Sequence, residues 1–211
     1  MEKYRIAYVD ENPEEIRQFQ RYASDDFEVV PFEPPENLKE IVDLILDNKV
    51  LALISDYNLT EYNNIARYDG VDVVREFLKF KPGFPTFVLT SYDEDAANES
   101  SDVNVVYTKK VLNQDLGIPF KERIRKQIQH YLQKIESSRK ELSELLKKRE
   151  SEKLTMQEEE KLLELDSFIE QSINAECALP KDLKVPSNAD KLSEILKSTR
   201  ELIEEIKVQI K

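Results

Sequence analysis

Acidic, hydroxyl and amine side chains stand directly after four short apolar runs in the first half of the chain. Asp10 and Glu11 follow the first run, Asp56 follows the third, Thr90 ends the fourth, and Lys109 follows the fifth. If these side chains meet, they form a site with three carboxylates, a hydroxyl and an ammonium. Close carboxylates raise one another's pKa unless a cation neutralises them, and Mg²⁺ with its preference for oxygen ligands suits that role.

This set of groups is suited to phosphoryl transfer. A carboxylate beside Mg²⁺ can attack a phosphoryl group and form an acyl phosphate. The Thr90 hydroxyl and the Lys109 ammonium could then hold the new phosphoryl oxygens. A single polar residue after a strand is a weak signal, because strand ends are commonly polar. Four strands that end with complementary chemistry favour a functional site.

The elements that must position these groups alternate between β-rich runs and helical patterns over residues 1–118. Strands are expected over residues 4–9, 27–32, 50–55, 85–89 and 103–107. Helices are expected over residues 13–23, 38–46 and 71–80, with a short polar helix over 93–101. Because parallel neighbours need crossover connections, the alternation predicts an α/β domain with a five-stranded parallel sheet. Sites in such sheets form at the carboxyl ends of the strands, which is where the polar groups stand.

The second half of the chain, residues 119–211, reads as all-helical. One seam repeats every four and three residues over about three heptads: Ile124, Ile128, Tyr131, Ile135, Ser138, Leu142 and Leu145. A second helix is predicted from a capping box at Thr155 and Glu158 to about Glu176, and a third from Ser187 or Asn188 onward. Short connections favour a helical hairpin or a three-helix bundle. The seam fits either the core of that bundle or a coiled-coil homodimer.

Composition narrows the classes of function. All of the formal charge of −12 lies in residues 1–118, which hold 12 Lys and Arg against 24 Asp and Glu. Such a half would repel nucleic acid and suits a cation site. One histidine, His130, and one cysteine, Cys177, exclude disulfide frameworks and Cys- or His-rich metal centres. No apolar run approaches a membrane span and the N-terminus lacks a signal peptide, so we expect a cytoplasmic protein.

Two features of the helical half have ordinary explanations. Residues 119–150 hold ten Lys and Arg against five Asp and Glu, but these bases are scattered around a heptad helix. A solvated helix face is therefore a better interpretation than a nucleic-acid surface, and no helix-turn-helix is recognisable. His130 is expected to be a structural histidine, because its neighbours lack the acidic residue that histidine kinases use.

The first 118 residues resemble the receiver domain of two-component response regulators. Residues 9–13, Val-Asp-Glu-Asn-Pro, match the acidic opening of that family, and Asp56 falls on its phospho-acceptor aspartate. Asp69-Gly70 resembles the Asp-Gly before the third helix, Thr90 the switch hydroxyl, and Lys109 the invariant lysine.

The resemblance implies a flavodoxin-like fold and phosphorylation of Asp56 by a histidine kinase or a phosphotransfer protein. It also implies Mg²⁺ held by Asp10, Glu11, Asp56 and the Asn58 carbonyl.

The sequence departs from the family pattern in three places. Glu11 stands where Asp is commoner, although its longer side chain can still ligate a metal. The loop between Asp56 and Gly70 is longer than usual and lacks the family's Met-Pro. Lys110 stands where a proline normally follows the lysine, which leaves open whether Lys109 or Lys110 is the functional amine, with Tyr107 as an aromatic switch in the second case.

We therefore expect a response regulator whose helices make protein–protein contacts as its output, with no enzyme activity beyond self-catalysed phosphoryl transfer. One alternative is an adaptor that recruits a partner protein without phosphorylation. Another is a haloacid-dehalogenase phosphatase, but that signature needs a second Asp where this chain has Asn58. A downstream protein partner and a homodimer are compatible with the pattern, whereas nucleic-acid and membrane partners are not expected.

Overall fold

A five-stranded parallel sheet organises the first part of the chain. The computed structural model describes residues 3–61, 65–91, 106–112 and 114–173. The strands are β1 (Tyr4–Val9), β2 (Phe27–Phe32), β3 (Leu53–Asp56), β4 (Thr86–Thr90) and β5 (Val106–Thr108). Their order in the sheet is β2-β1-β3-β4-β5, and every neighbouring pair is parallel. The predicted parallel α/β sheet is therefore confirmed, and its strand order is that of flavodoxin-like folds.

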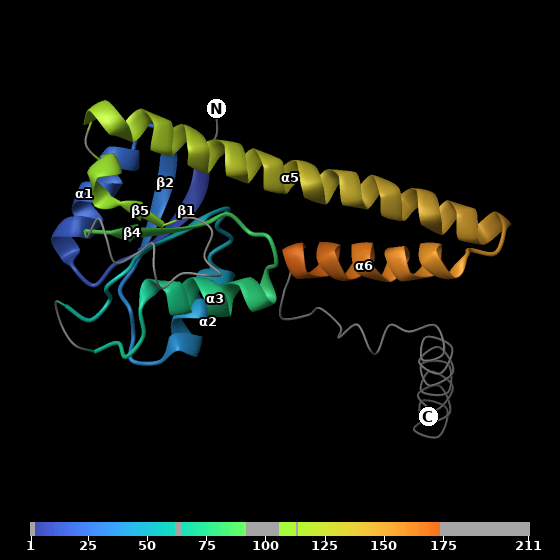
Figure 1. Ribbon diagram of the computed structural model, residues 1–211, viewed down its shortest axis with the longest axis horizontal. Helices are drawn as coiled ribbons and strands as arrows, with labels where there is room; N and C mark the ends of the chain where they lie inside the picture. Colours follow the sequence, from blue (N-terminus) through green and yellow to red (C-terminus); the bar gives the residue numbers. More distant parts are fainter. Residues whose placement is uncertain (1–2, 62–64, 92–105, 113, 174–211) are drawn as a thin grey trace, which may run out of the picture. The chain divides into compact units, whose positions relative to one another are not determined.

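Helices cover both faces of this sheet (Figure 1). The helices are α1 (Pro13–Ala23), α2 (Leu38–Asp47), α3 (Gly70–Phe80), α5 (Gln114–Ser151) and α6 (Met156–Ile173), with a 3₁₀ turn, η1 (Lys109–Leu112), before α5. Helix α1 and the first part of α5 pack on one face, whereas α2 and α3 lie on the other. Coverage of both faces explains why the strands read as continuous apolar runs.

Aromatic side chains dominate the core on the α1 and α5 face. The rings of Tyr8 and Phe19 stack in parallel with their centroids 4.0 Å apart. Phe87 meets Phe120 of α5 edge-to-face at 5.6 Å. Tyr8, Phe19 and Phe87 have no exposed surface, so α1, the sheet and α5 share one core.

Helix α5 begins at Gln114, five residues before Pro119, where the predicted all-helical half of the sequence starts. Pro119 lacks the N–H that would bond to the preceding turn, which costs helix stability. Burial of Phe120, Ile124 and Ile128 against the sheet outweighs this cost. The expected domain boundary at residue 118 thus falls inside α5, and contacts divide the chain into units of residues 1–134 and 135–211.

In the second unit, the end of α5 pairs with α6. Lys148 Nζ lies 2.7 Å from Glu158 Oε1, and Lys161 pairs with Glu141. The predicted capping box is present: Glu158 N donates to Thr155 Oγ1 over 3.3 Å, and Thr155 N donates to Glu158 Oε2 over 3.0 Å. The short helix over 93–101, the third helix from Ser187 or Asn188, and Cys177 lie outside the described residues.

The heptad seam divides between the two units. Ile124, Ile128 and Tyr131 are buried in the first unit, where Tyr131 meets Phe84 edge-to-face at 5.4 Å. Ser138 is buried in the second unit, and Ile135, Leu142 and Leu145 are partly buried there. The first half of the seam therefore belongs to the core of the α/β domain, and only its second half lies in the helical unit.

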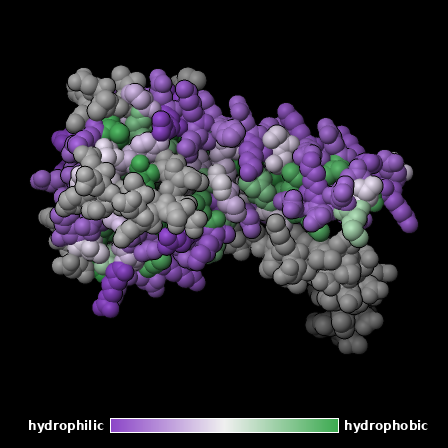
Figure 2. Space-filling model, in the orientation of Figure 1, coloured by the Kyte–Doolittle hydropathy of each residue, from purple (hydrophilic) through white to green (hydrophobic). Residues whose placement is uncertain are grey.

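The described surface is largely hydrophilic in the view of Figure 2, with hydrophobic side chains in separate spots. The exposed large apolar residues are scattered over the described surface: Leu44 in α2, Ile65 in the loop after β3, Leu146 in α5, and Met156 and Ile173 at the two ends of α6. No helix in the described part of the chain is both long enough and apolar enough to cross a membrane.

Candidate functional site

The polar groups after four strands meet at one edge of the sheet. They line a cavity of about 420 Å³ at the carboxyl ends of β1, β3, β4 and β5. The residues that line it are Asp10, Glu11, Asn12, Glu15, Asp56, Tyr57, Asn58, Glu61, Thr90, Ser91 and Lys109. The cavity lies where the strand order reverses between β1 and β3, which is where parallel α/β sheets form their sites.

Asp10 is held in place from two directions. Its Oδ1 accepts a hydrogen bond from the Asn12 N–H over 2.8 Å, and its Oδ2 accepts one from the buried Tyr8 hydroxyl over 2.7 Å. Burial and the nearby Asp10 carboxylate raise the pKa of Tyr8 well above its usual value, so the hydroxyl stays a donor. Asn12 also caps α1 by accepting from the Glu14 N–H, which fixes the turn that follows β1.

Asp56 ends β3 and is nearly buried. Its Oδ2 accepts from the Asn58 N–H over 3.1 Å, and its main chain is held by the Tyr57 N–H, which donates to Leu89 O over 2.7 Å. Burial raises the pKa of Asp56 to about 7, although Lys109 opposes this rise. The carboxylate is thus costly to ionise unless a cation or another positive group is close.

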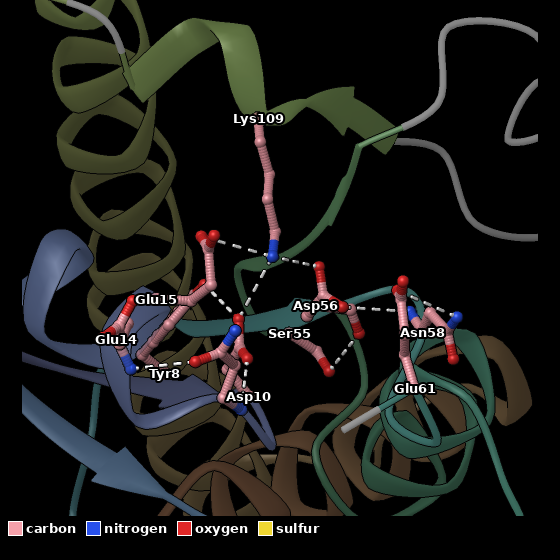
Figure 3. Close-up of polar contacts among 10 residues, drawn as sticks. Tyr8, Asp10, Glu14, Glu15, Ser55, Asp56, Asn58, Glu61 and Lys109 are labelled. Atoms are coloured by element: carbon pink, nitrogen blue, oxygen red, sulfur yellow. Dashed lines mark hydrogen bonds and ion pairs between the residues drawn. The ribbon is translucent and has the colours of Figure 1, made fainter.

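Lys109 supplies a positive charge to this cluster (Figure 3). Its Nζ lies 2.8 Å from Asp56 Oδ1, 3.3 Å from Asp10 Oδ2 and 3.5 Å from Glu15 Oε2. Burial lowers the pKa of Lys109, but the carboxylates of Asp56 and Asp10 outweigh it, and the pKa is raised. The ammonium therefore stays charged. Of the two candidate lysines, Lys109 lines the cavity, whereas Lys110 is exposed.

Glu11 and Thr90 complete the set of residues expected from the sequence. Both are buried and both line the cavity. Asn58 turns its side chain into the loop, where Oδ1 accepts from Thr60 N over 3.1 Å. Tyr107, the candidate aromatic switch in β5, lies beside α5. Its ring centroid is 5.0 Å from that of Phe120, and its hydroxyl is 2.5 Å from Arg123 Nη1.

The donor chemistry of the cavity fits a magnesium ion. Asp10, Glu11 and Asp56 offer hard oxygen ligands, and Asn58 also lines the cavity. In the described residues, no three acidic, His or Cys side chains already stand close enough together to hold a metal ion. The positive charge that bridges Asp10 and Asp56 is the Lys109 ammonium.

Two acidic residues of the cavity were not expected from the sequence. Glu15 projects from the first turns of α1 to Lys109, and Glu61 comes from the long loop after β3, where its Oε2 accepts from Asn58 Nδ2 over 3.4 Å. Glu15 could have been found, because the N-terminus of a helix that follows a parallel strand lies beside the carboxyl edge of the sheet. Glu61 depends on the fold of its loop.

Comparisons with known proteins find similarity at the level of structure. No protein-family model matches the sequence, and no curated protein matches it. The similar solved structures include a CheY-like response regulator receiver domain protein from Methanospirillum hungatei JF-1. It is 17% identical over 61% of this chain and 99% of its own, with a TM-score of 0.48.

Two further structures are similar. Response regulator TrrA from Thermotoga maritima, solved in complex with Mg(2+)-BeF, is 22% identical over 59% of this chain and 98% of its own, at a TM-score of 0.46. Anti-anti-sigma factor PhyR from Bartonella quintana is 16% identical over 65% of this chain, at a TM-score of 0.49. This chain spans 51% of the PhyR chain.

Proposed function

We propose that this protein is a phosphoreceiver of a two-component relay and that Asp56 accepts the phosphoryl group. The observation that carries the proposal is the position of Lys109, whose Nζ lies 2.8 Å from Asp56 Oδ1 inside a cavity that Thr90 also lines. A carboxylate, an ammonium and a hydroxyl from three different strand ends thus face one space.

In the proposed reaction, a carboxylate oxygen of Asp56 attacks the phosphorus of a phosphohistidine. The new P–O bond forms as the P–N bond breaks, and its electron pair leaves with the imidazole of the donor. The Lys109 ammonium moves from the carboxylate to a phosphoryl oxygen, and the Thr90 hydroxyl donates to another. Asp10, Glu11, Asp56 and the Asn58 carbonyl would hold a magnesium ion here, and that ion would supply positive charge to offset the phosphoryl oxygens.

The output of this switch is proposed to be a change in protein–protein contact. Lys109 is the first residue of η1, which precedes α5 along the chain. A displacement of Lys109 toward a phosphoryl group therefore acts on the segment that begins the long helix. The phosphoryl charge added at Asp56 would thereby change the packing of helices that a downstream protein recognises.

Incubation with acetyl phosphate and Mg²⁺, followed by mass spectrometry of the intact chain, tests the proposal. We expect one phosphoryl group on the wild type that hydroxylamine removes, as an acyl phosphate requires. The Asp56→Asn variant is nearly isosteric and should carry none. A wild type that stays unmodified, or an equal yield on the variant, would reject the mechanism.

A second candidate function is a phosphorylation-independent adaptor. The observation that favours it is the departure of this chain from the receiver pattern at Glu11, in the loop between Asp56 and Gly70, and at Lys110. In that case the helices have one conformation, whether or not Asp56 is phosphorylated, and they recruit a partner protein in that conformation. Partner binding that Asp56→Asn and beryllofluoride both leave unchanged would favour the adaptor over the relay.

A further inference from the structure

Glu15 places a third carboxylate on the ammonium of Lys109. Its Oε2 lies 3.5 Å from Nζ, beside the Asp56 and Asp10 oxygens at 2.8 and 3.3 Å. Figure 3 shows these three carboxylates around the end of the lysine side chain. About one third of the Glu15 side chain is exposed, against 1% for Asp10 and 9% for Asp56, so Glu15 is the most accessible of the three.

The cavity as a whole is strongly acidic. Among the described residues, five carboxylates line it, from Asp10, Glu11, Glu15, Asp56 and Glu61, against the ammonium of Lys109. Metal binding and nucleophilic attack already give roles to Asp10, Glu11 and Asp56. Glu15 has no such role, yet it competes for the same ammonium that a phosphoryl group needs.

We propose that Glu15 sets the donor specificity of the site by holding Lys109 and repelling small phosphoryl donors. The proposal rests on the proposed function of Asp56. A donor such as acetyl phosphate arrives as a dianion. To react, its phosphorus must bond to an Asp56 oxygen while the P–O bond to the acetyl group breaks and acetate leaves with the electron pair. The oxygens of the phosphoryl group must meanwhile replace Glu15 on Lys109.

The carboxylate of Glu15 makes the approach of this dianion electrostatically unfavourable, and a neutral residue at position 15 would not. A negative charge within several ångströms of the dianion is unfavourable, and in a partly buried cavity the repulsion is only partly screened. A protein donor can offset that cost with contacts outside the cavity, whereas a small donor has none. Glu15 acts through Lys109 and through its charge, so it is a positioning residue.

The test compares Glu15→Gln with Glu14→Gln in the whole 211-residue chain. Glu14 stands on the same helical turn and loses the same charge, but its side chain is 87% exposed, ion-pairs with Arg17 and does not line the cavity. We expect Glu15→Gln to raise the rate of Asp56 phosphorylation by acetyl phosphate about tenfold at low salt, with a smaller gain at high salt. Glu15→Asp keeps the charge and should stay slow.

Beryllofluoride binding in the presence of Mg²⁺ gives a second measurement that does not depend on turnover. Glu15→Gln should tighten it several-fold, and Glu14→Gln should not. If the wild type is phosphorylated but both glutamine variants behave alike, or if the gain does not depend on salt, the role of Glu15 is refuted while the function of Asp56 stands. If the wild type and all variants stay unmodified, the phosphoreceiver function itself fails.

Discussion

A Cβ atom on Gly70 would lie 1.9 Å from the main-chain oxygen of Asp56, so the two residues are neighbours only because position 70 has no side chain. The Gly70 N–H donates to the Tyr57 carbonyl over 2.9 Å. Asp69 caps α3 at this point and forms a reciprocal capping box with Asp72. The start of α3 is thereby fixed against the end of the strand that carries the proposed phospho-acceptor.

Gly70→Ala should therefore disturb both stability and the site. The methyl group would collide with main-chain atoms rather than with a flexible side chain, so β3 or α3 must shift. We expect a loss of about 1–3 kcal/mol in the free energy of unfolding, measured with urea, and slower phosphorylation of Asp56. Gly83→Asn is the control, because a Cβ at Gly83 would meet only the end of the Lys134 side chain, at 3.9 Å, and its φ of 74° is one that Asn tolerates. Equal losses for the two variants would contradict the close-approach argument.

The Asp56 carboxylate should make stability depend on pH. Its folded-state pKa is about 7, raised by burial, whereas an unfolded Asp titrates near a pKa of about 4. The folded state therefore binds the proton more tightly, and stability falls as the pH rises from about 4 to about 7. Asp56→Asn lacks this dependence.

At pH 8 without metal, Asp56→Asn should be more stable than the wild type by about 1–3 kcal/mol, and at pH 5 the gap should shrink. Urea unfolding at both pH values with EDTA measures it. Added Mg²⁺ should stabilise the wild type more than the variant and narrow the gap. A gap that is the same at pH 5 and pH 8 would show that the Asp56 carboxylate is not the cause.

The fold was largely predictable because its signals are local. Apolar runs with covered faces, Pro13 at the start of α1, and Asp69-Gly70 before α3 each indicate an element without knowledge of the rest. The start of α5 was not predictable in this way. A proline inside a helix contradicts local preference, and burial of Phe120 and Ile124 against the sheet, which only the tertiary structure shows, overrides it.

Part of the site was predictable from the rule that sites in parallel sheets form at the carboxyl ends of the strands. That rule places Asp10, Asp56, Thr90 and Lys109 at one edge, and they line one cavity. It could not choose between Lys109 and Lys110, because a one-residue change in register turns the side chain to the other side. The hydrogen bond from the Tyr8 hydroxyl to Asp10 was not predictable either, because a tyrosine inside an apolar strand has the pattern of an ordinary core residue.

Helix α6 should depend on its capping box. Thr155→Ala removes the hydroxyl that accepts from the Glu158 N–H and leaves the first turn of α6 with an unsatisfied donor. We expect the amides of α6 to exchange faster with solvent, in line with a loss of about 1 kcal/mol for the Thr cap. Thr155→Ser keeps the hydroxyl and should exchange like the wild type. Unchanged exchange in Thr155→Ala would mean that packing alone defines the start of the helix.

Asp26 joins the end of α1 to α5 through two cations. Its Oδ2 lies 2.8 Å from Lys121 Nζ, and its Oδ1 pairs with Arg125. The hydrogen bond from Lys121, with that from Arg125, lowers the pKa of Asp26 although burial raises it. A lowered folded-state pKa gives stability that is present above the unfolded pKa of about 4 and is lost as the pH falls through the folded value.

Asp26→Asn should therefore destabilise the protein by about 1 kcal/mol at pH 7, a modest loss because all three side chains are partly exposed. The gap to the wild type should begin to narrow as the pH falls below about 4, where the unfolded carboxyl takes up its proton, and should close below the lowered folded-state pKa, where the folded carboxyl is neutral as well. Urea unfolding at pH 7 and at pH 3 measures both. Asp25→Asn, an exposed neighbour, controls for net charge. If it weakens the protein as much, the loss comes from overall charge and not from the bridge to α5.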